Sequence, residues 1–154
     1  MSLALSPSLR AARAGSIITL DLMVVAGAEQ VDGVELYLHF DPAVLKVVDA
    51  AGSLATSIES DTTALDVPLE NLVDNTAGTI RYDAGRLVPD WPTGTFRVAT
   101  ARFKVVGSAA TTEVRYVAPS DVFFAGSSML GTGALGHADL PHAEGVMFMP
   151  VIRR

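Results

Sequence analysis

The sequence predicts an all-β protein, an antiparallel β-sandwich of eight or nine strands. Three observations favour this class: apolar and polar residues alternate over strand-length runs, Gly- and Pro-bearing turns separate many of the runs, and no segment shows a sustained helical period. The chain has 154 residues, which fits one domain of ordinary size. We therefore expect a single domain over residues 1–154.

The first two expected strands show the alternation clearly. In residues 17–25 one face collects the apolar side chains of Ile18, Leu20, Leu22 and Val24. In residues 31–40 one face collects those of Val34, Leu36, Leu38 and Phe40. The opposite face of this second strand carries Gly33, Glu35, Tyr37 and His39. Asp41-Pro42 then ends the strand, because proline donates no ladder hydrogen bond.

The other strands are expected over shorter runs, at residues 44–48, 67–73, 79–84, 98–106, 113–117 and 146–152. A tight turn from Asp74 to Gly78 joins two of them, because Asn75 and Gly78 tolerate the positive φ of a reversal. Residues 126–145 are rich in Gly, Ala and Ser and predict a long loop before the last strand.

Composition excludes several classes of function. The formal net charge of −6 would repel phosphate backbones, so we expect no nucleic-acid partner. No apolar run is long enough to span a bilayer, so membrane insertion is not expected. The chain has no cysteine, which removes thiolate nucleophiles and Cys-ligated zinc.

Two motifs fall in the expected loop. Gly131, Gly133 and Gly136 match the spacing of a dinucleotide fingerprint, but no βαβ unit surrounds them, so no nucleotide cofactor is predicted. Four possible metal ligands follow within eight residues, namely His137, Asp139, His142 and Glu144. A glycine-rich loop offers such ligands little support, so the favoured interpretation is a solvated polar loop without a metal.

Neither catalysis nor sugar binding is the favoured function. The sequence has no Gly-x-Ser-x-Gly motif, and its three histidines are scattered, so we predict no enzyme activity. Sugar-binding sandwiches typically present a row of exposed aromatic rings. Only Trp91, in a loop, and Tyr37, on an expected strand, are candidates, which leaves carbohydrate binding as the alternative function.

The polar face of residues 31–40 has two interpretations. It could be an ordinary solvated face of an antiparallel sheet. It could instead be a docking surface for a protein, because Tyr and Arg are enriched in binding hot spots. If Thr79, Arg81 and Asp83 lie on a neighbouring strand, they extend this surface, although a register slip of one residue would expose Tyr82 instead.

The order of these motifs resembles the cohesin family. The signature strand is similar throughout Val34-Glu-Leu-Tyr-Leu-His-Phe-Asp-Pro-Ala-Val-Leu-Lys-Val-Val48. Asp74-Asn-Thr-Ala-Gly-Thr-Ile80 resembles the central hairpin of the family, and Val98-Ala-Thr-Ala-Arg-Phe-Lys-Val105 resembles a later strand. The resemblance covers residues 4–151, which is the expected core of the domain. It extends to cohesin-like modules of surface proteins outside cellulosomes.

The resemblance implies a nine-stranded jelly-roll sandwich, related in fold to carbohydrate-binding modules, that is not catalytic. It implies a dockerin-like protein partner, an extracellular or cell-surface setting and a link to polysaccharide degradation. Calcium would belong to the dockerin, so no cofactor is expected on this chain. The family commonly uses an Asn and an Asp on its third strand to contact dockerin, and Gly33 and Glu35 occupy these positions here. Glu35 keeps the charge, whereas Gly33 cannot supply an amide group.

Overall fold

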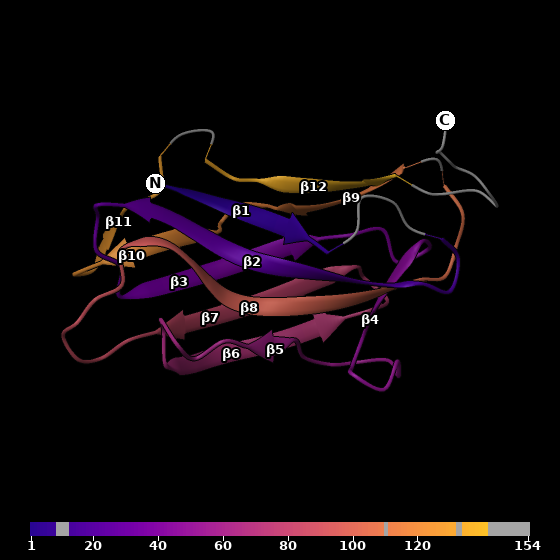
Figure 1. Ribbon diagram of the computed structural model, residues 1–154, viewed down its shortest axis with the longest axis horizontal. Coiled ribbons are helices and arrows are strands. Elements are labelled where there is room, and N and C mark those ends of the chain that lie inside the picture. The colour runs from indigo at the N-terminus through magenta and orange to yellow at the C-terminus, as the bar shows by residue number, and fades with distance from the viewer. Residues whose placement is uncertain (9–12, 110, 132–133, 142–154) are drawn as a thin grey trace, which may run out of the picture.

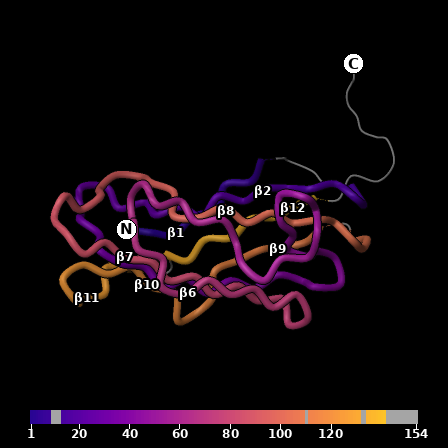
Figure 2. The backbone as a smooth tube through the Cα atoms, turned by 90° about the horizontal axis from the view of Figure 1, so that it is seen from below, coloured from indigo at the N-terminus to yellow at the C-terminus, as the bar shows by residue number. Residues whose placement is uncertain are grey.

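Two antiparallel sheets make up the computed structural model, which describes residues 1–8, 13–109, 111–131 and 134–141. Within these ranges the chain forms strands and turns and no helix, so the all-β prediction is confirmed. Figure 2 shows the two sheets as layers packed on one another. The described residues contain twelve strands rather than the expected nine, because several short segments also enter the ladders.

The first sheet has five strands (Figure 1), which are β1 (Ser2–Pro7), β2 (Ile17–Gly27), β4 (Leu45–Val48), β5 (Glu59–Ser60) and β8 (Gly94–Val105). They lie in the order β1-β2-β8-β4, and the short β5 also pairs with β8. The long β8 is therefore the centre of this sheet, where it holds β2 along most of its length.

The second sheet has seven strands, which are β3 (Gly33–His39), β6 (Val67–Asp74), β7 (Thr79–Gly85), β9 (Thr111–Tyr116), β10 (Asp121–Phe124), β11 (Ser127–Ser128) and β12 (His137–Pro141). The order β11-β10-β3-β7-β6 places β3 and β7 in the middle. On the β10 side, β10 pairs with the first half of β3 and β9 with its last residues, while β12 extends β9 outward. Three strands, β7, β9 and β10, thus pair with β3.

The core lies where the inner faces of the two sheets meet. The alternating apolar residues of β2 and β3 are buried as predicted, since a pleated strand sends successive side chains to opposite faces. Phe40, at the end of the signature strand, meets Phe103 of β8 edge to face, with ring centroids 5.2 Å apart. This contact ties the Phe-Asp-Pro corner to the centre of the opposite sheet.

The predicted turn between β6 and β7 is confirmed. Gly78 has a φ of +74°, and its N–H donates to the carbonyl of Asp74 at 2.9 Å. The Gly78 carbonyl in turn accepts the N–H of Phe40 at 2.9 Å, so the turn anchors the end of β3. The Gly78 N–H therefore closes the turn within the hairpin, and its carbonyl connects the hairpin to the signature strand.

The prediction of a long loop over residues 126–145 is wrong. β11 and β12 fall inside it, and β12 pairs with β9 along all five of its residues. Ala138 and Leu140, two residues apart in β12, are both buried in the core. This alternation covers only five residues next to a glycine-rich segment, which is too short to predict a strand. The strand expected at residues 146–152 lies outside the described residues.

Candidate functional site

The burial of the inward residues of β3 fixes the direction of its outward residues. Val34, Leu36 and Leu38 lie in the core, so strict alternation turns Glu35 and Tyr37 to the outer surface of the second sheet. The middle of β3 is further fixed by Ser120, whose hydroxyl accepts the Tyr37 N–H at 2.8 Å and donates to the Tyr37 carbonyl at 3.0 Å. The backbone beneath Tyr37 is thus rigidly placed.

The register between β3 and β7 brings all seven predicted docking residues to one surface. Glu35 lies opposite Asp83, Tyr37 opposite Arg81, and His39 opposite Thr79. Tyr82 points inward and is fully buried, so the slipped register does not occur. We call this surface the β3–β7 face; it consists of Gly33, Glu35, Tyr37, His39, Thr79, Arg81 and Asp83.

Arg81 occupies the centre of the β3–β7 face. Its guanidinium carbon lies 5.4 Å from the centroid of the Tyr37 ring, and its Nη2 forms an ion pair of 2.9 Å with Glu70 of β6. A hydrogen bond with Tyr37 and the charge of Glu70 raise the pKa of Arg81 above its ordinary value. Tyr37, Arg81 and Glu70 therefore form one connected group across three strands, half-exposed or exposed to solvent.

Asp83 carries the perturbed carboxylate of this face. Burial raises its pKa above the ordinary value, and the negative charges of Glu35 and Glu70 raise it further. Its Oδ1 atom is buried and receives no hydrogen bond from the described residues. The face thus holds a partly desolvated carboxylate with one oxygen that lacks a hydrogen bond from the described part of the chain.

The β3–β7 face continues onto two more strands. Arg115 of β9 lies opposite His39, and His137 of β12 lies opposite Arg115. The sequence did not predict that β9 and β12 continue this face, because the pairing of segments that lie far apart in the chain leaves no local sequence pattern. The outer surface of the sheet therefore extends from β6 to β12.

The residues of the possible metal cluster are only partly described. His137 and Asp139 project from the same side of β12 and lie 3.5 Å apart, and Glu113 of β9 joins them with all ligand atoms within 4.8 Å. Glu113 also faces Arg115 at 3.8 Å, so part of its charge is already balanced. His142 and Glu144 lie outside the described residues. A strand rather than a loop carries the two described ligands.

The two aromatic candidates for sugar binding have different neighbours. Trp91 lies between β7 and β8, and its ring meets Phe124 of β10 edge-on, with centroids 6.1 Å apart. Tyr37 lies instead beneath Arg81. Within the described residues these contacts assemble no row of parallel rings.

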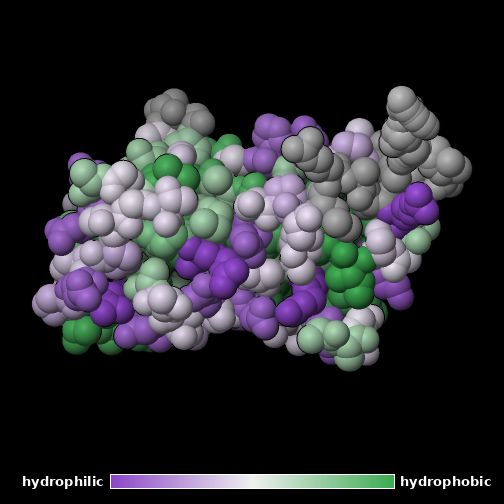
Figure 3. All heavy atoms as spheres, in the orientation of Figure 1, coloured by the Kyte–Doolittle hydropathy of each residue, from purple (hydrophilic) through white to green (hydrophobic). Residues whose placement is uncertain are grey.

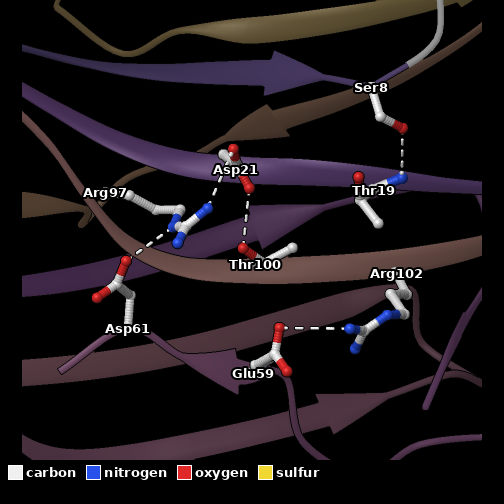
Figure 4. Close-up of polar contacts among 8 residues, drawn as sticks. All are labelled: Ser8, Thr19, Asp21, Glu59, Asp61, Arg97, Thr100 and Arg102. Carbon is white, nitrogen blue, oxygen red and sulfur yellow. Dashed lines mark hydrogen bonds and ion pairs between the residues drawn. The ribbon is translucent and has the colours of Figure 1, made fainter. Parts of the chain in front are cut away.

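The outer face of the first sheet bears a separate polar network (Figure 4). Asp21 accepts a hydrogen bond from Thr100 at 2.8 Å, and Arg97 connects Asp21 with Asp61 through contacts of 3.6 and 2.8 Å. Hydrophilic residues gather over the middle of this face in the space-filling view (Figure 3). The charges are mutually paired, so this network serves the sheet itself and offers few free groups to a ligand.

In the described part of the chain, no helix has the length and apolar character needed to cross a membrane. No family model and no curated protein matches the sequence.

Solved structures show a clear likeness. The chain is similar to a type II cohesin domain from the cellulosome of Acetivibrio cellulolyticus, with a TM-score of 0.75 and 19% identity over 90% of this chain and 94% of that one. It is similar to a chain of a mutant type II cohesin–X-dockerin complex from the same organism, with a TM-score of 0.75 and 15% identity over 92% and 98% of the two chains. A cohesin module from a Clostridium perfringens family 33 glycoside hydrolase gives a TM-score of 0.67 and 13% identity over 92% and 96%. The chain therefore adopts the β-sandwich fold of cohesin modules.

Proposed function

We propose that this chain is a non-catalytic module that docks a dockerin-like protein through the β3–β7 face. The observation that carries the proposal is the registered pairing of Tyr37 with Arg81 and of Glu35 with Asp83 on a well-supported, accessible sheet surface. Tyr and Arg are enriched among the residues that dominate binding energies. Because paired strands already fix their backbone, these residues lose little conformational entropy when a partner binds.

The likeness to solved cohesins supports the class of partner. One of the similar chains comes from a complex of a cohesin with an X-dockerin. The proposal includes an extracellular or cell-surface setting linked to polysaccharide degradation, with the calcium carried by the dockerin. Function by protein contact also fits the outer surface, where the residues of the β3–β7 face lie in cross-strand pairs along two neighbouring strands.

The test is binding of purified dockerin modules, with the X-dockerin of Acetivibrio cellulolyticus and a panel of others as probes, followed by isothermal titration calorimetry. We expect at least one module to bind. The double substitution Glu35→Arg and Tyr37→Ala should then weaken binding by about a thousandfold, since loss of each hot-spot residue costs about 2 kcal/mol. The melting temperature should not fall by much, because both side chains are only half-buried and Glu35→Arg removes a like-charge pair with Asp83.

A matched charge reversal on the other sheet provides the control. Glu59→Arg places the same new charge on β5, far from the β3–β7 face in the topology, and should leave dockerin binding unchanged. Failure of every dockerin to bind would contradict the partner class, and binding that survives the double substitution would contradict the face. Retardation by polysaccharides in affinity electrophoresis, abolished by Trp91→Ala, would establish the carbohydrate-binding alternative instead.

A further inference from the structure

A trough crosses the outer surface of the second sheet at the start of β3. Gly33 lies directly opposite Gly85 of β7, and neither residue contributes a side chain. The same row continues outward to Val67 of β6 on one side and to Phe123 of β10 on the other. The two adjacent glycines and Phe123 line a groove of about 330 Å³.

Two exposed leucines form walls of this groove. The register between β6 and β7 shifts at Leu69, so this residue has no partner on β7 and bulges from the strand. Its side chain is 71% exposed, and that of Leu87, which follows β7, is 79% exposed. A single exposed leucine needs no explanation, but both of these line the same groove. The groove therefore offers apolar surface that a partner could bury.

A row of four carboxylates crosses the sheet beside the trough, and its two middle members, Glu35 and Asp83, line the groove. Glu70 of β6 lies opposite Asp83 of β7, Asp83 opposite Glu35 of β3, and Glu35 opposite Asp121 of β10. Like charges directly opposite each other destabilise a sheet, so this arrangement costs the fold free energy. We call these four residues the acidic row.

Among the described residues, only Glu70 at one end of the acidic row forms an ion pair, although the charge of Arg81 also acts on Asp83. Arg81 pairs with Glu70, and Arg86, which also lines the groove, faces Asp66 with its Nη1 at 3.9 Å. In the middle of the row, the buried Oδ1 of Asp83 has no donor among the described residues. At the other end, the Asp121 Oδ1 accepts hydrogen bonds from the Val122 N–H and the Ser128 hydroxyl, each at 2.8 Å. A ligand that carries positive charge would therefore meet carboxylates without a paired cation, above all Glu35, beside the apolar trough.

We propose that the trough receives one large apolar side chain of a protein partner, and that Lys or Arg residues flanking this side chain lie over the acidic row. This inference rests on the proposed docking function and specifies the chemistry of the partner segment. The glycine pair supplies the space, Leu69, Leu87 and Phe123 supply the apolar contact, and the acidic row selects the charge of the neighbours.

Synthetic helical peptides test this pairing directly. The first probe has a central leucine with a lysine one turn before and after it; a second replaces the leucine by serine, and a third replaces the lysines by glutamates. Backbone amide NMR should show shifts at Gly33, Gly85 and Leu87 with the first peptide, and affinities at least about tenfold weaker for the other two. Raising the salt to about 0.5 M should weaken the first peptide, because it screens the acidic row.

Gly33→Leu is the decisive variant because it fills the trough without straining the backbone. A Cβ atom at Gly33 would meet only the Ala84 carbonyl at 3.6 Å and the Phe123 Cβ at 4.0 Å, which are ordinary contacts. Gly131→Leu is the matched control, since a Cβ there would have nothing within 4 Å. We expect Gly33→Leu to abolish the peptide shifts and Gly131→Leu to keep them. Equal binding of the serine peptide, shifts elsewhere, no binding, or insensitivity to Gly33→Leu would each overturn the inference.

A dockerin that binds the chain separates this inference from the proposed function. Loss of binding in both Gly33→Leu and the Glu35→Arg, Tyr37→Ala double variant supports the trough and the face together. Loss in the double variant alone overturns the trough and leaves the docking face standing.

Discussion

Glu35 lies directly opposite Asp83 across β3 and β7, so two carboxylates share one cross-strand pair on the exposed side of the sheet. Such a pair lowers the stability of the fold, because like charges repel and burial disfavours the ionised form of Asp83. This destabilising pair lies on the surface that we propose for docking. The pKa of Asp83 is raised and that of Asp61 is lowered, so substitutions of the two residues should have opposite effects on stability.

Asp83→Asn should stabilise the protein at neutral pH. The pKa of Asp83 is raised in the folded state, so folding favours its protonated form. Stability from this group is present below the ordinary pKa of about 4 and is lost as the pH rises through the raised value. Thermal unfolding followed by circular dichroism should therefore show a higher melting temperature for the variant at pH 7 and no gain at pH 3. A lower melting temperature at pH 7 would contradict the prediction.

Asp61→Asn should have the opposite effect. Hydrogen bonds from Thr63, followed by the ion pair with Arg97, lower the pKa of Asp61. Its stabilisation is present above the ordinary pKa and is lost as the pH falls through the lowered value. The same melting experiment should show a loss at pH 7 that disappears in acid. Equal losses at both pH values would mean that the charge of Asp61 is not the cause.

Two buried tyrosines provide a matched pair for hydrogen bonding. The Tyr116 hydroxyl donates to the Ala4 carbonyl at 2.9 Å, whereas the buried Tyr82 hydroxyl has Ser60 nearby but forms no hydrogen bond of good geometry with the described residues. Tyr116→Phe should lower the free energy of unfolding by about 1 kcal/mol, because it leaves a carbonyl unpaired. Tyr82→Phe should be neutral or stabilising. Urea denaturation measures both, and a larger loss for Tyr82→Phe would refute the assignment.

Two glycines separate backbone strain from steric clash. Gly78 and Gly126 both have positive φ values, +74° and +79°. A Cβ at Gly126 would meet nothing within 4 Å, so Gly126→Ala should cost only about 1 kcal/mol of unfolding free energy. A Cβ at Gly78 would collide with the Phe40 carbonyl and with Pro42, so Gly78→Ala should cost about 3 kcal/mol or more. Equal costs in urea denaturation would show that the turn does not depend on this close approach.

The sequence predicted the sandwich because its strongest signal is local. In β2 and β3, apolar and polar residues alternate, and successive side chains of a strand point to opposite faces of its sheet. The sequence of each strand therefore shows which of its side chains are buried, whatever its position in the sheet. The turn at Gly78 was equally predictable from positive-φ chemistry. The strands β1, β10 and β12 were missed because four to six residues carry too little alternation to be separated from loops.

The sequence by itself determined that Glu35 and Tyr37 face away from the core, and that the protein is built from strands. The tertiary structure alone decided what lies beside them: Arg81 and not Tyr82 next to Tyr37, glycine next to glycine, and carboxylates from β6, β7, β3 and β10 in one row. The reason is physical. The direction of a side chain follows from the pleat of its own strand, whereas its neighbours depend on the register of strands that are joined only when distant segments pair.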